Sequence, residues 1–437
     1  MRKTYDHLQS QVSMDSLVDM VRQKLLSLPD PRNRQVSHTF HDIVMSGFAM
    51  FHFKYPSINC FDKQTQSERA NLKSLFKIEK LCSDTHLRNT FDAADPGILR
   101  ELYRDGFDLL KKVGVLTDYR LGTKHLICSI DGVQHFSSKE IHCPDCQVKN
   151  HRDGTKTYSH SMLAAALVHP DQKEVFILDT EPIIKQDGVK KNDCELNASH
   201  RLFDSLSDKY KDEKLLLIED ALYANGPHLR SILDRKWDFI VSIKPGGHAA
   251  LFKLFETRQA NNAVRYLEYK DDQGTLHRYW YGNDFPLNGS ATDVRVNVLM
   301  YEEKKKNGKI QRFSWATSLA LHARNVKQIT RIGRSRWKIE NETFNTLKNQ
   351  GYHFDHNFGH GNKHLCTAFA FLMCLAFQID QIFQRCSLVF QRLWMTAQTK
   401  VKLWEIIRSI FSVTIVYSFK ELYAATAAQF LISLDSS

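Results

Sequence analysis

Three carboxylates in the sequence occupy positions from which they could share a divalent cation. Asp131 follows the apolar run LICSI, and Asp220 follows LLLI and Glu219. A carboxylate at the end of a buried strand is well placed beside a cleft. Glu219 is an alternative to Asp220, but neighbouring residues of a strand point to opposite faces. If the two strands are adjacent, Asp131 and Asp220 lie side by side and repel each other unless a divalent cation bridges them.

The third carboxylate, Glu340, lies within RSRWKIENETFNTLK. If the segment forms one α-helix, its periodicity predicts that Glu340 faces the packed side and that Glu342 faces away. The packed side then consists of Ile329, Ile332, Gly333, Arg336, Glu340, Thr343, Phe344 and Leu347. A buried carboxylate needs a partner. One interpretation is an Arg336–Glu340 ion pair across one turn at the edge of a packed helix, and the other is a metal-ligand role for Glu340.

The metal-ligand interpretation defines the chemistry of the site. Two aspartates and a glutamate offer hard oxygen ligands, which suit Mg²⁺ or Mn²⁺ and not zinc. Two such ions about 3.5–4 Å apart would activate a water or a 3′-hydroxyl and stabilise the leaving oxygen of a phosphodiester. The three carboxylates therefore predict a two-metal site for phosphodiester chemistry.

The segments around these carboxylates resemble the Asp-Asp-Glu transposases of bacterial insertion sequences, specifically the family numbered four and its unclassified relatives. The resemblance runs from about Leu126 to Phe377, with a looser likeness over the N-terminal helices. The motifs that carry it are SIDG, IEDALY and RSRWKIENETFNTLK. In that family an aromatic follows the second Asp by three residues, as Tyr223 does here. The resemblance implies an RNase H-like fold with a β-rich insertion between the second Asp and the Glu.

The third motif of that family is Tyr, two residues, Arg, three residues, Glu, six residues, Lys. Arg336 and Glu340 match its Arg–Glu spacing, and Trp337 and Ile339 match common flanking residues. Gly333 stands where the family has Tyr. The Lys comes one residue late, at Lys348, which leaves Asn341 as an alternative to Glu340.

The resemblance implies cut-and-paste transposition of an insertion sequence. Asp131, Asp220 and Glu340 would hold two Mg²⁺ or Mn²⁺ ions, and 3′-hydroxyls released at the element ends would pass through a hairpin stage before attacking target DNA. The expected partner is double-stranded DNA, both terminal inverted repeats and target, held by a homodimer. The alternatives are a metal-dependent nuclease of the same fold without strand transfer, and a non-catalytic DNA-binding derivative of a transposase.

Several residues near the predicted site could contact DNA. Arg336 and Lys348 would contact phosphate, and Trp337 would support the helix or a displaced base. Lys244, in SIKPGGH, could reach a phosphate or lie in a solvated turn. The full set of candidate DNA contacts is Arg336, Lys348, Lys244, Arg334, Trp337 and Tyr223.

A second possible metal site lies in HCPDCQVKNHRDGTKTYSH. The pair Cys143-x-x-Cys146, with His142 and His151 nearby, could form half of a structural zinc site. No second CxxC or His pair follows at regular spacing, which favours a plain turn with free thiols. Four histidines after the third motif, His353, His356, His360 and His364, lie among glycines and favour a polar or solvated loop over a metal site.

Composition and charge agree with a globular DNA-binding protein. The chain has 437 residues, 42% hydrophobic and 25% charged, and a formal net charge of +11, which favours a polyanionic partner. The N-terminus MRKTYDHLQS leads into no apolar segment, so we expect no secretory signal. TAFAFLMCLAF is too short to span a bilayer and predicts a core helix. Nine cysteines, mostly isolated in apolar stretches, indicate a reducing cytoplasm, and we expect a nucleoid-associated bacterial protein without a membrane partner.

The chain order predicts an α/β protein in three parts. The first part, residues 1–120, is predicted to be a helical DNA-binding domain. Residues 121–377 form an RNase H-like mixed sheet, with a β-rich insertion at about 250–320 whose hairpin turns include Asp272–Gly274 and Asn307–Gly308. Between its third and fourth strands, Asn192 and Asp193 are predicted helix caps. Residues 378–437 form a C-terminal helical region.

Overall fold

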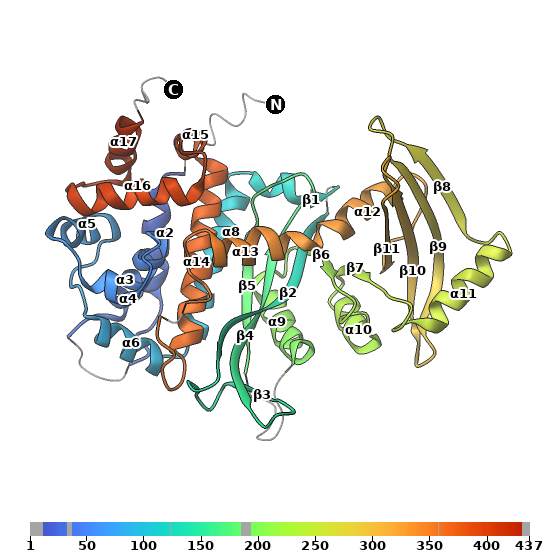
Figure 1. Cartoon of the computed structure of the whole chain (residues 1–437), viewed down its shortest axis with the longest axis horizontal. Coiled ribbons are helices and arrows are strands. Elements are labelled where there is room, and N and C mark those ends of the chain that lie inside the picture. The colour runs from blue at the N-terminus through green and yellow to red at the C-terminus, as the bar shows by residue number, and fades with distance from the viewer. Residues whose placement is uncertain (1–11, 33–36, 123, 185–193, 357, 431–437) are drawn as a thin grey trace.

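The computed structural model describes residues 12–430 except 33–36, 123, 185–193 and 357 (Figure 1). Helices from both ends of the chain gather on one side of a central sheet. The β-rich insertion lies at the end of the sheet away from these helices, as Figure 1 shows. The predicted α/β class, the β-rich insertion and the helices at both ends are therefore confirmed. The predicted caps Asn192 and Asp193 lie outside the described residues.

The N-terminal region is helical, as predicted. Its first helices each begin after a Ser or Thr whose side chain accepts a hydrogen bond from a backbone N–H of the first turn. The helices are α2 (Met14–Ser27), α3 (Phe40–His52), α4 (Ile58–Asp62), α5 (Gln66–Phe76), α6 (Asp84–Ala93), α7 (Gly97–Arg100), α8 (Leu102–Lys112) and the 3₁₀ helix η1 (Val115–Tyr119).

The central sheet joins antiparallel and parallel strands. Its strands are β1 (Arg120–Leu121), β2 (His125–Ser138), β3 (Gln147–Asn150), β4 (Lys156–Leu167), β5 (Phe176–Ile183), β6 (Lys214–Glu219) and β7 (Asp238–Ser242). β5, β4 and β2 pair antiparallel, and β6 and β7 continue from β2 in parallel. The order β5-β4-β2-β6-β7 is that of an RNase H-like sheet. In chain order α9 (Glu195–Lys209) lies between β5 and β6, and α10 (Gly226–Asp234) lies between β6 and β7, as the crossover between parallel strands requires.

The β-rich insertion extends this sheet. After α11 (Ala249–Ala260) come β8 (Arg265–Lys270), β9 (Leu276–Asn288), β10 (Ala291–Lys304) and β11 (Ile310–Thr317). β11 pairs antiparallel with β7, so the eleven strands form one continuous sheet. Gly274 and Gly308 adopt φ of 78° and 82° at the two predicted hairpin turns, a conformation that favours glycine.

The C-terminal helices pack against the N-terminal ones. They are α14 (Leu365–Cys386), α15 (Leu388–Ala397), α16 (Lys400–Val413) and α17 (Phe419–Gln429), and α14 contacts α3, α6 and α8. Among the described residues, α14 is the one helix long and apolar enough to cross a membrane, and its apolar stretch lies wholly inside the protein, as expected for a core helix. It continues through residue 377, and the domain limits at 120 and 377 stay predictions.

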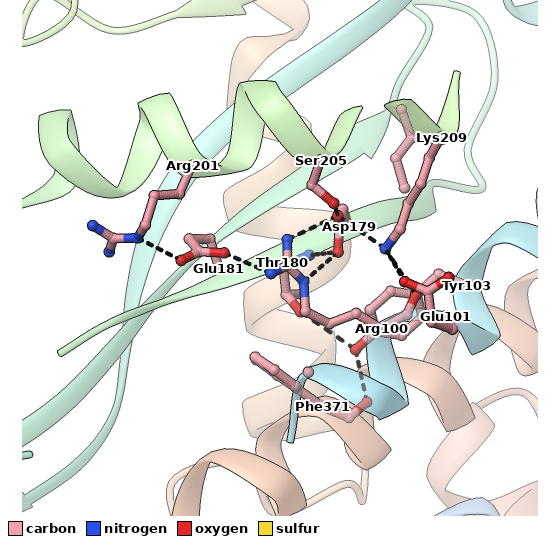
Figure 2. A network of polar contacts seen from close by, with 12 residues as sticks. Arg100, Glu101, Tyr103, Asp179, Thr180, Glu181, Arg201, Ser205, Lys209 and Phe371 are labelled. Carbon is pink, nitrogen blue, oxygen red and sulfur yellow. Dashed lines mark hydrogen bonds and ion pairs between the residues drawn. The ribbon is translucent and has the colours of Figure 1, made fainter. Parts of the chain in front are cut away.

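A buried ionic network joins the sheet to the helices around it (Figure 2). On the edge strand β5, Asp179 and Glu181 point to the same face, and both are almost fully buried. Arg100 donates two hydrogen bonds to Asp179, at 2.8 and 2.9 Å, and one to Glu181, at 2.6 Å. From α9, Arg201 bonds Glu181 and Lys209 lies 3.3 Å from Asp179. The network therefore ties β5 to the N-terminal helices and to α9.

We expect Asp179→Ala to lower the free energy of unfolding by about 3–5 kcal/mol, because it leaves buried cations short of a partner. The matched control is Asp293→Ala, whose carboxylate pairs with Arg230 but is 61% exposed. Its urea unfolding midpoint should stay close to that of the wild type. Equal losses in the two variants would show that the Asp179 network does not hold β5 in place.

Candidate active site

The register of β2 and β6 places the first two predicted carboxylates together. Ser129 pairs with Ile218 in the parallel ladder, and the same register continued by two residues puts Asp131 level with Asp220. Glu219, the rival to Asp220, points to the other face, is 1% exposed and lies 2.9 Å from His228 of α10. Strand alternation therefore separates Glu219 from Asp220, which follows the end of β6. Asp131 lies in the middle of β2, which continues to Ser138, so the prediction that it follows the end of a strand is wrong.

The predicted single α-helix across the third motif is wrong. The segment consists of α12 (Val326–Arg334), a 3₁₀ turn (Ser335–Trp337), a π-helical turn (Ile339–Phe344) and α13 (Asn345–Asn349). A tight turn followed by a wide one changes the angle at which later side chains emerge. Ile339 consequently occupies the fully buried position, and the Glu340 side chain is 48% exposed. The predicted burial of Glu340 is wrong, and Glu342, which was predicted to face away from the packed side, is half-buried.

The π-helical turn also bears on the late lysine. A π turn closes an i→i+5 bond and so holds one residue more than an α turn. The chain has one residue more between Glu340 and Lys348 than the family motif has, and the π turn overlaps this stretch. Lys348 is partly exposed, and its Nζ lies 3.3 Å from Asp355 Oδ1. Asn341, the rival to Glu340, is exposed and accepts a hydrogen bond from Asn345.

The other departure from the family motif has a steric basis. A Cβ atom built on Gly333 would lie 2.7 Å from the indole of Trp315, a contact that real side chains do not make. Trp315 comes from β11 of the insertion and is 2% exposed. The buried indole fills the space beside Gly333, so a tyrosine at that position could not fit without moving it.

Arg336 brings two of the carboxylates together. Its Nη1 lies 3.1 Å from Asp131 Oδ2, and its Nη2 lies 2.6 Å from Glu340 Oε1. Burial lowers the pKa of Arg336, but its hydrogen bond to Glu340 and the charges of Glu340, Asp131 and Asp220 raise the pKa above its usual value. The predicted Arg336–Glu340 ion pair is therefore present, and the same guanidinium also bonds Asp131.

The surroundings of Asp131 disfavour the charged form of its carboxylate. Burial raises its pKa to about 7; Arg336 acts in the opposite direction, and the charge of Glu340 adds to the rise. The Asp131 carboxylate also accepts a hydrogen bond from the backbone N–H of Gly132 at 2.9 Å. A carboxyl group in this state gains from any additional positive charge placed beside it.

A fourth carboxylate, Glu195, lies at this site and was missed in the sequence. It opens α9, and its Oε1 would lie 2.5 Å from a Cβ atom built on Gly132. Tyr223 donates a hydrogen bond to its other oxygen at 3.1 Å. Burial raises the pKa of Glu195; the Tyr223 hydrogen bond lowers it, and the charge of Asp220 raises it further. The glycine after Asp131 was the one sequence signal, because its missing side chain makes room for Glu195.

The remaining predicted DNA contacts occupy different environments. Tyr223 is fully buried and supports Glu195, so its side chain does not reach the protein surface. Arg334 pairs with Glu303 of the insertion at 2.5 Å, and Trp337 is 44% exposed. Lys244 is exposed on a hollow of about 600 Å³ that is lined also by Phe252, Trp280, Arg312, Phe313 and Trp315.

The histidines predicted beside Cys143 and Cys146 lie elsewhere. His142 stacks on Tyr158, and His151 bonds Thr157. Two other histidines, His160 of β4 and His360 of the loop before α14, lie against the cysteines instead. His360 is 5% exposed, so the prediction that it belongs to a solvated loop is wrong.

Comparison with known proteins gives one family match. A family model described as a transposase DDE domain matches residues 142–377, which include Asp220 and Glu340 and begin after Asp131. No curated protein matches the chain.

We expect Asp131→Asn to stabilise the metal-free protein above neutral pH. The pKa of Asp131 is raised from 3.8 to about 7 in the folded chain, so its stabilising contribution is complete below pH 3.8 and lost as the pH rises through 7. Asn carries no charge to bury, and at pH 8 the variant should exceed the wild type by roughly 1–3 kcal/mol.

The measurement is thermal unfolding of both proteins in EDTA at pH 5 and pH 8. The advantage of the variant should grow between the two. An advantage that does not change with pH would mean that Asp131 titrates normally.

Proposed function

The chain belongs to the family of transposase DDE domains, and from this premise we propose that it cuts and rejoins DNA at a site built by Asp131, Asp220 and Glu340. The observation that supports this assignment most is the convergence on Arg336. Asp131 in the middle of β2 and Glu340 of the third motif, far apart in the sequence, both contact this guanidinium, and the charge of Asp220 after β6 also acts on it. A carboxylate cluster with so little positive charge suits an anionic substrate only when cations accompany it.

The donor set fits divalent cations of the Mg²⁺ type. Its ligand atoms are carboxylate oxygens, and burial and a neighbouring carboxylate already raise the pKa of Asp131. Asp131, Asp220 and Glu340 would hold the ions. When bound, a pair of such ions supplies the charge that activates a hydroxyl nucleophile and stabilises the leaving oxygen.

The other side chains act around these ligands. Arg336 holds Asp131 and Glu340 in place while no cation is bound, and it can turn to a DNA phosphate when one is. The half-exposed Glu340 can move toward a ligand without breaking packed contacts. Glu195 lies behind the aspartates with its carboxylate oriented by Tyr223, and it adds negative charge that strengthens cation binding.

Basic and aromatic side chains around the site suit the DNA. Arg336 and Lys348 would contact phosphates next to the scissile bond, and the exposed Trp337 would support a displaced base. The hollow beside Lys244 offers aromatic rings with a cation at its rim, so the insertion would hold the DNA flanking the cut. Arg334 would join it on release from Glu303.

We propose cut-and-paste transposition as the overall reaction. Hydrolysis would free 3′-hydroxyls at the element ends, a hairpin would form and reopen, and the 3′-hydroxyls would attack target DNA in line. The two ends must react together, which calls for a homodimer. The net charge of +11 supports the binding of several DNA segments at once.

We expect Glu340→Gln to abolish most DNA cleavage while leaving the fold intact. The side chain is 48% exposed, so loss of its ion pair with Arg336 should cost less than about 1 kcal/mol. Loss of one anionic ligand should nevertheless reduce Mg²⁺-dependent cleavage by roughly 100-fold or more. The substrate is a plasmid that carries the DNA flanking the gene on both sides.

Glu342→Gln is the matched control, because Glu342 lies two residues further along the same segment and lines a different hollow with Lys173, Trp394 and Lys400. It should cleave like the wild type. An equal loss of cleavage in both variants would mean that the loss comes from disturbed helix packing. Cleavage without joined products would favour a nuclease, and DNA binding without any cleavage would favour a non-catalytic derivative.

We expect Glu195→Gln to shift the Mg²⁺ requirement without unfolding the protein. Removing its charge weakens the attraction for cations, so the Mg²⁺ concentration for half-maximal cleavage should rise several-fold, with partial recovery at high Mg²⁺. Glu256→Gln, at an exposed position of α11, is the control. A lower rate with an unchanged Mg²⁺ curve would contradict a role for Glu195 in holding the cation.

A further inference from the structure

A buried cluster of two cysteines and two histidines lies outside the carboxylate site. Cys143 and Cys146 flank a tight turn between β2 and β3, His160 is on β4, and His360 is in the loop between α13 and α14. All four side chains are buried, and their ligand atoms lie within 4.8 Å of one another. We infer that these four residues hold a structural zinc ion.

The distances within the cluster match tetrahedral zinc. The two sulfurs are 3.9 Å apart, and each lies 3.3 Å from His160 Nε2. Cys146 Sγ is also 3.4 Å from His360 Nε2. Ligands at the usual zinc–sulfur and zinc–nitrogen lengths of a tetrahedron stand about 3.8 Å apart for two sulfurs and about 3.5 Å apart for sulfur and nitrogen. The cluster therefore surrounds a centre of the right size.

The surrounding hydrogen bonds orient the ligand atoms toward that centre. The backbone N–H of Cys143 points at Cys146 Sγ, at 3.4 Å, and the Cys146 N–H closes the turn on Cys143 O. His360 Nδ1 lies 2.8 Å from the carbonyl oxygen of Gly361, which leaves Nε2 as the lone-pair nitrogen facing the sulfurs. A His that donates through one ring nitrogen in this way is the usual form of a zinc ligand.

A disulfide does not account for this arrangement. The sulfur atoms are 3.9 Å apart, well beyond a disulfide bond of about 2.05 Å. Two thiolates would also neutralise the charge of one Zn²⁺, so the ion could be buried without a further counter-charge. Two sulfurs and two nitrogens select zinc over Mg²⁺, which the oxygen ligands of the carboxylate site prefer.

Zinc here would connect segments that are far apart in the chain. His360 lies in the loop that follows Lys348 and α13, whereas His160 belongs to the strand paired with β2. The end of the same loop is held by Asp92 of α6, which accepts from the backbone N–H groups of residues 362–365. The ion would therefore hold the loop that follows α13 against the paired strands β2 and β4.

The test is the zinc content of the full chain, purified without added metal or a histidine tag. Elemental analysis should find about one zinc per chain. Replacing zinc by Co²⁺ should give thiolate-to-cobalt charge-transfer absorption together with the visible bands of a tetrahedral ion. Cys143→Ser, Cys146→Ser and His360→Asn should each lose most of the metal.

Two controls separate this site from other metal sites. His142→Asn changes the histidine next to Cys143 that stacks on Tyr158, and Asp131→Asn changes the carboxylate site; both should keep the full zinc content. The proposal would be overturned if either control lost as much zinc as the ligand variants do. A wild-type chain without zinc, a cobalt spectrum without thiolate bands, or a Cys143–Cys146 disulfide in the purified protein would also overturn it. The cobalt spectrum of the wild type decides the matter even if the cysteine variants do not fold. No DNA is used, so the result does not depend on transposase activity.

Discussion

The parallel pairing of β2 with β6 is the constraint on which the candidate active site depends. Its register, continued by two residues, puts Asp131 in the middle of β2 level with Asp220, which follows the end of β6. Like charges at that spacing oppose the fold, so the site needs a cation from elsewhere in the chain. The interrupted helix α12–α13 supplies it as Arg336, and Ser129 of β2 donates to the Arg336 carbonyl at 3.2 Å, which anchors that helix to the strand.

The ion-pair and metal-ligand interpretations of Glu340 are compatible. A guanidinium between Asp131 and Glu340 neutralises them in the absence of metal, and it occupies the place where cations would reduce the same repulsion. The ion pair is half-exposed and weak enough to exchange for a stronger interaction. A fully buried pair would resist such an exchange, because separating it would leave charges without partners. The exposure of Glu340 thus favours a site in which metal ions can replace Arg336 as the positive charge beside the carboxylates.

The sequence predicted most of this fold because its signals are local. Strand alternation separated Asp220 from Glu219, and glycines marked the hairpin turns. The direction of Glu340 could not be predicted, because a 100° rotation per residue assumes a regular helix and the 3₁₀ and π turns break that regularity. Glu195 and His360 were missed for a different reason. Each reaches its neighbours only through the fold, and His360 lies 214 residues from Cys146.

The two proposed metal sites lie along one pair of strands. In the β2–β4 ladder Asp131 pairs with Ala164, and Phe136 pairs with His160. Five residues of strand separate these points, roughly 17 Å. The segment that carries Glu340 and His360 approaches the same ladder twice, with the Glu340 carboxylate near Asp131 and the His360 ring near His160. Because hard and soft ligands select different ions, the proposed catalytic site would bind and release Mg²⁺ while the proposed zinc ion would stay bound to its four ligands. If only the carboxylate site held the interrupted helix α12–α13, the helix could rotate when Arg336 releases Glu340. With the proposed zinc ion holding the loop after α13 as well, metal ions could replace Arg336 beside the carboxylates while the helix stays in position on the sheet.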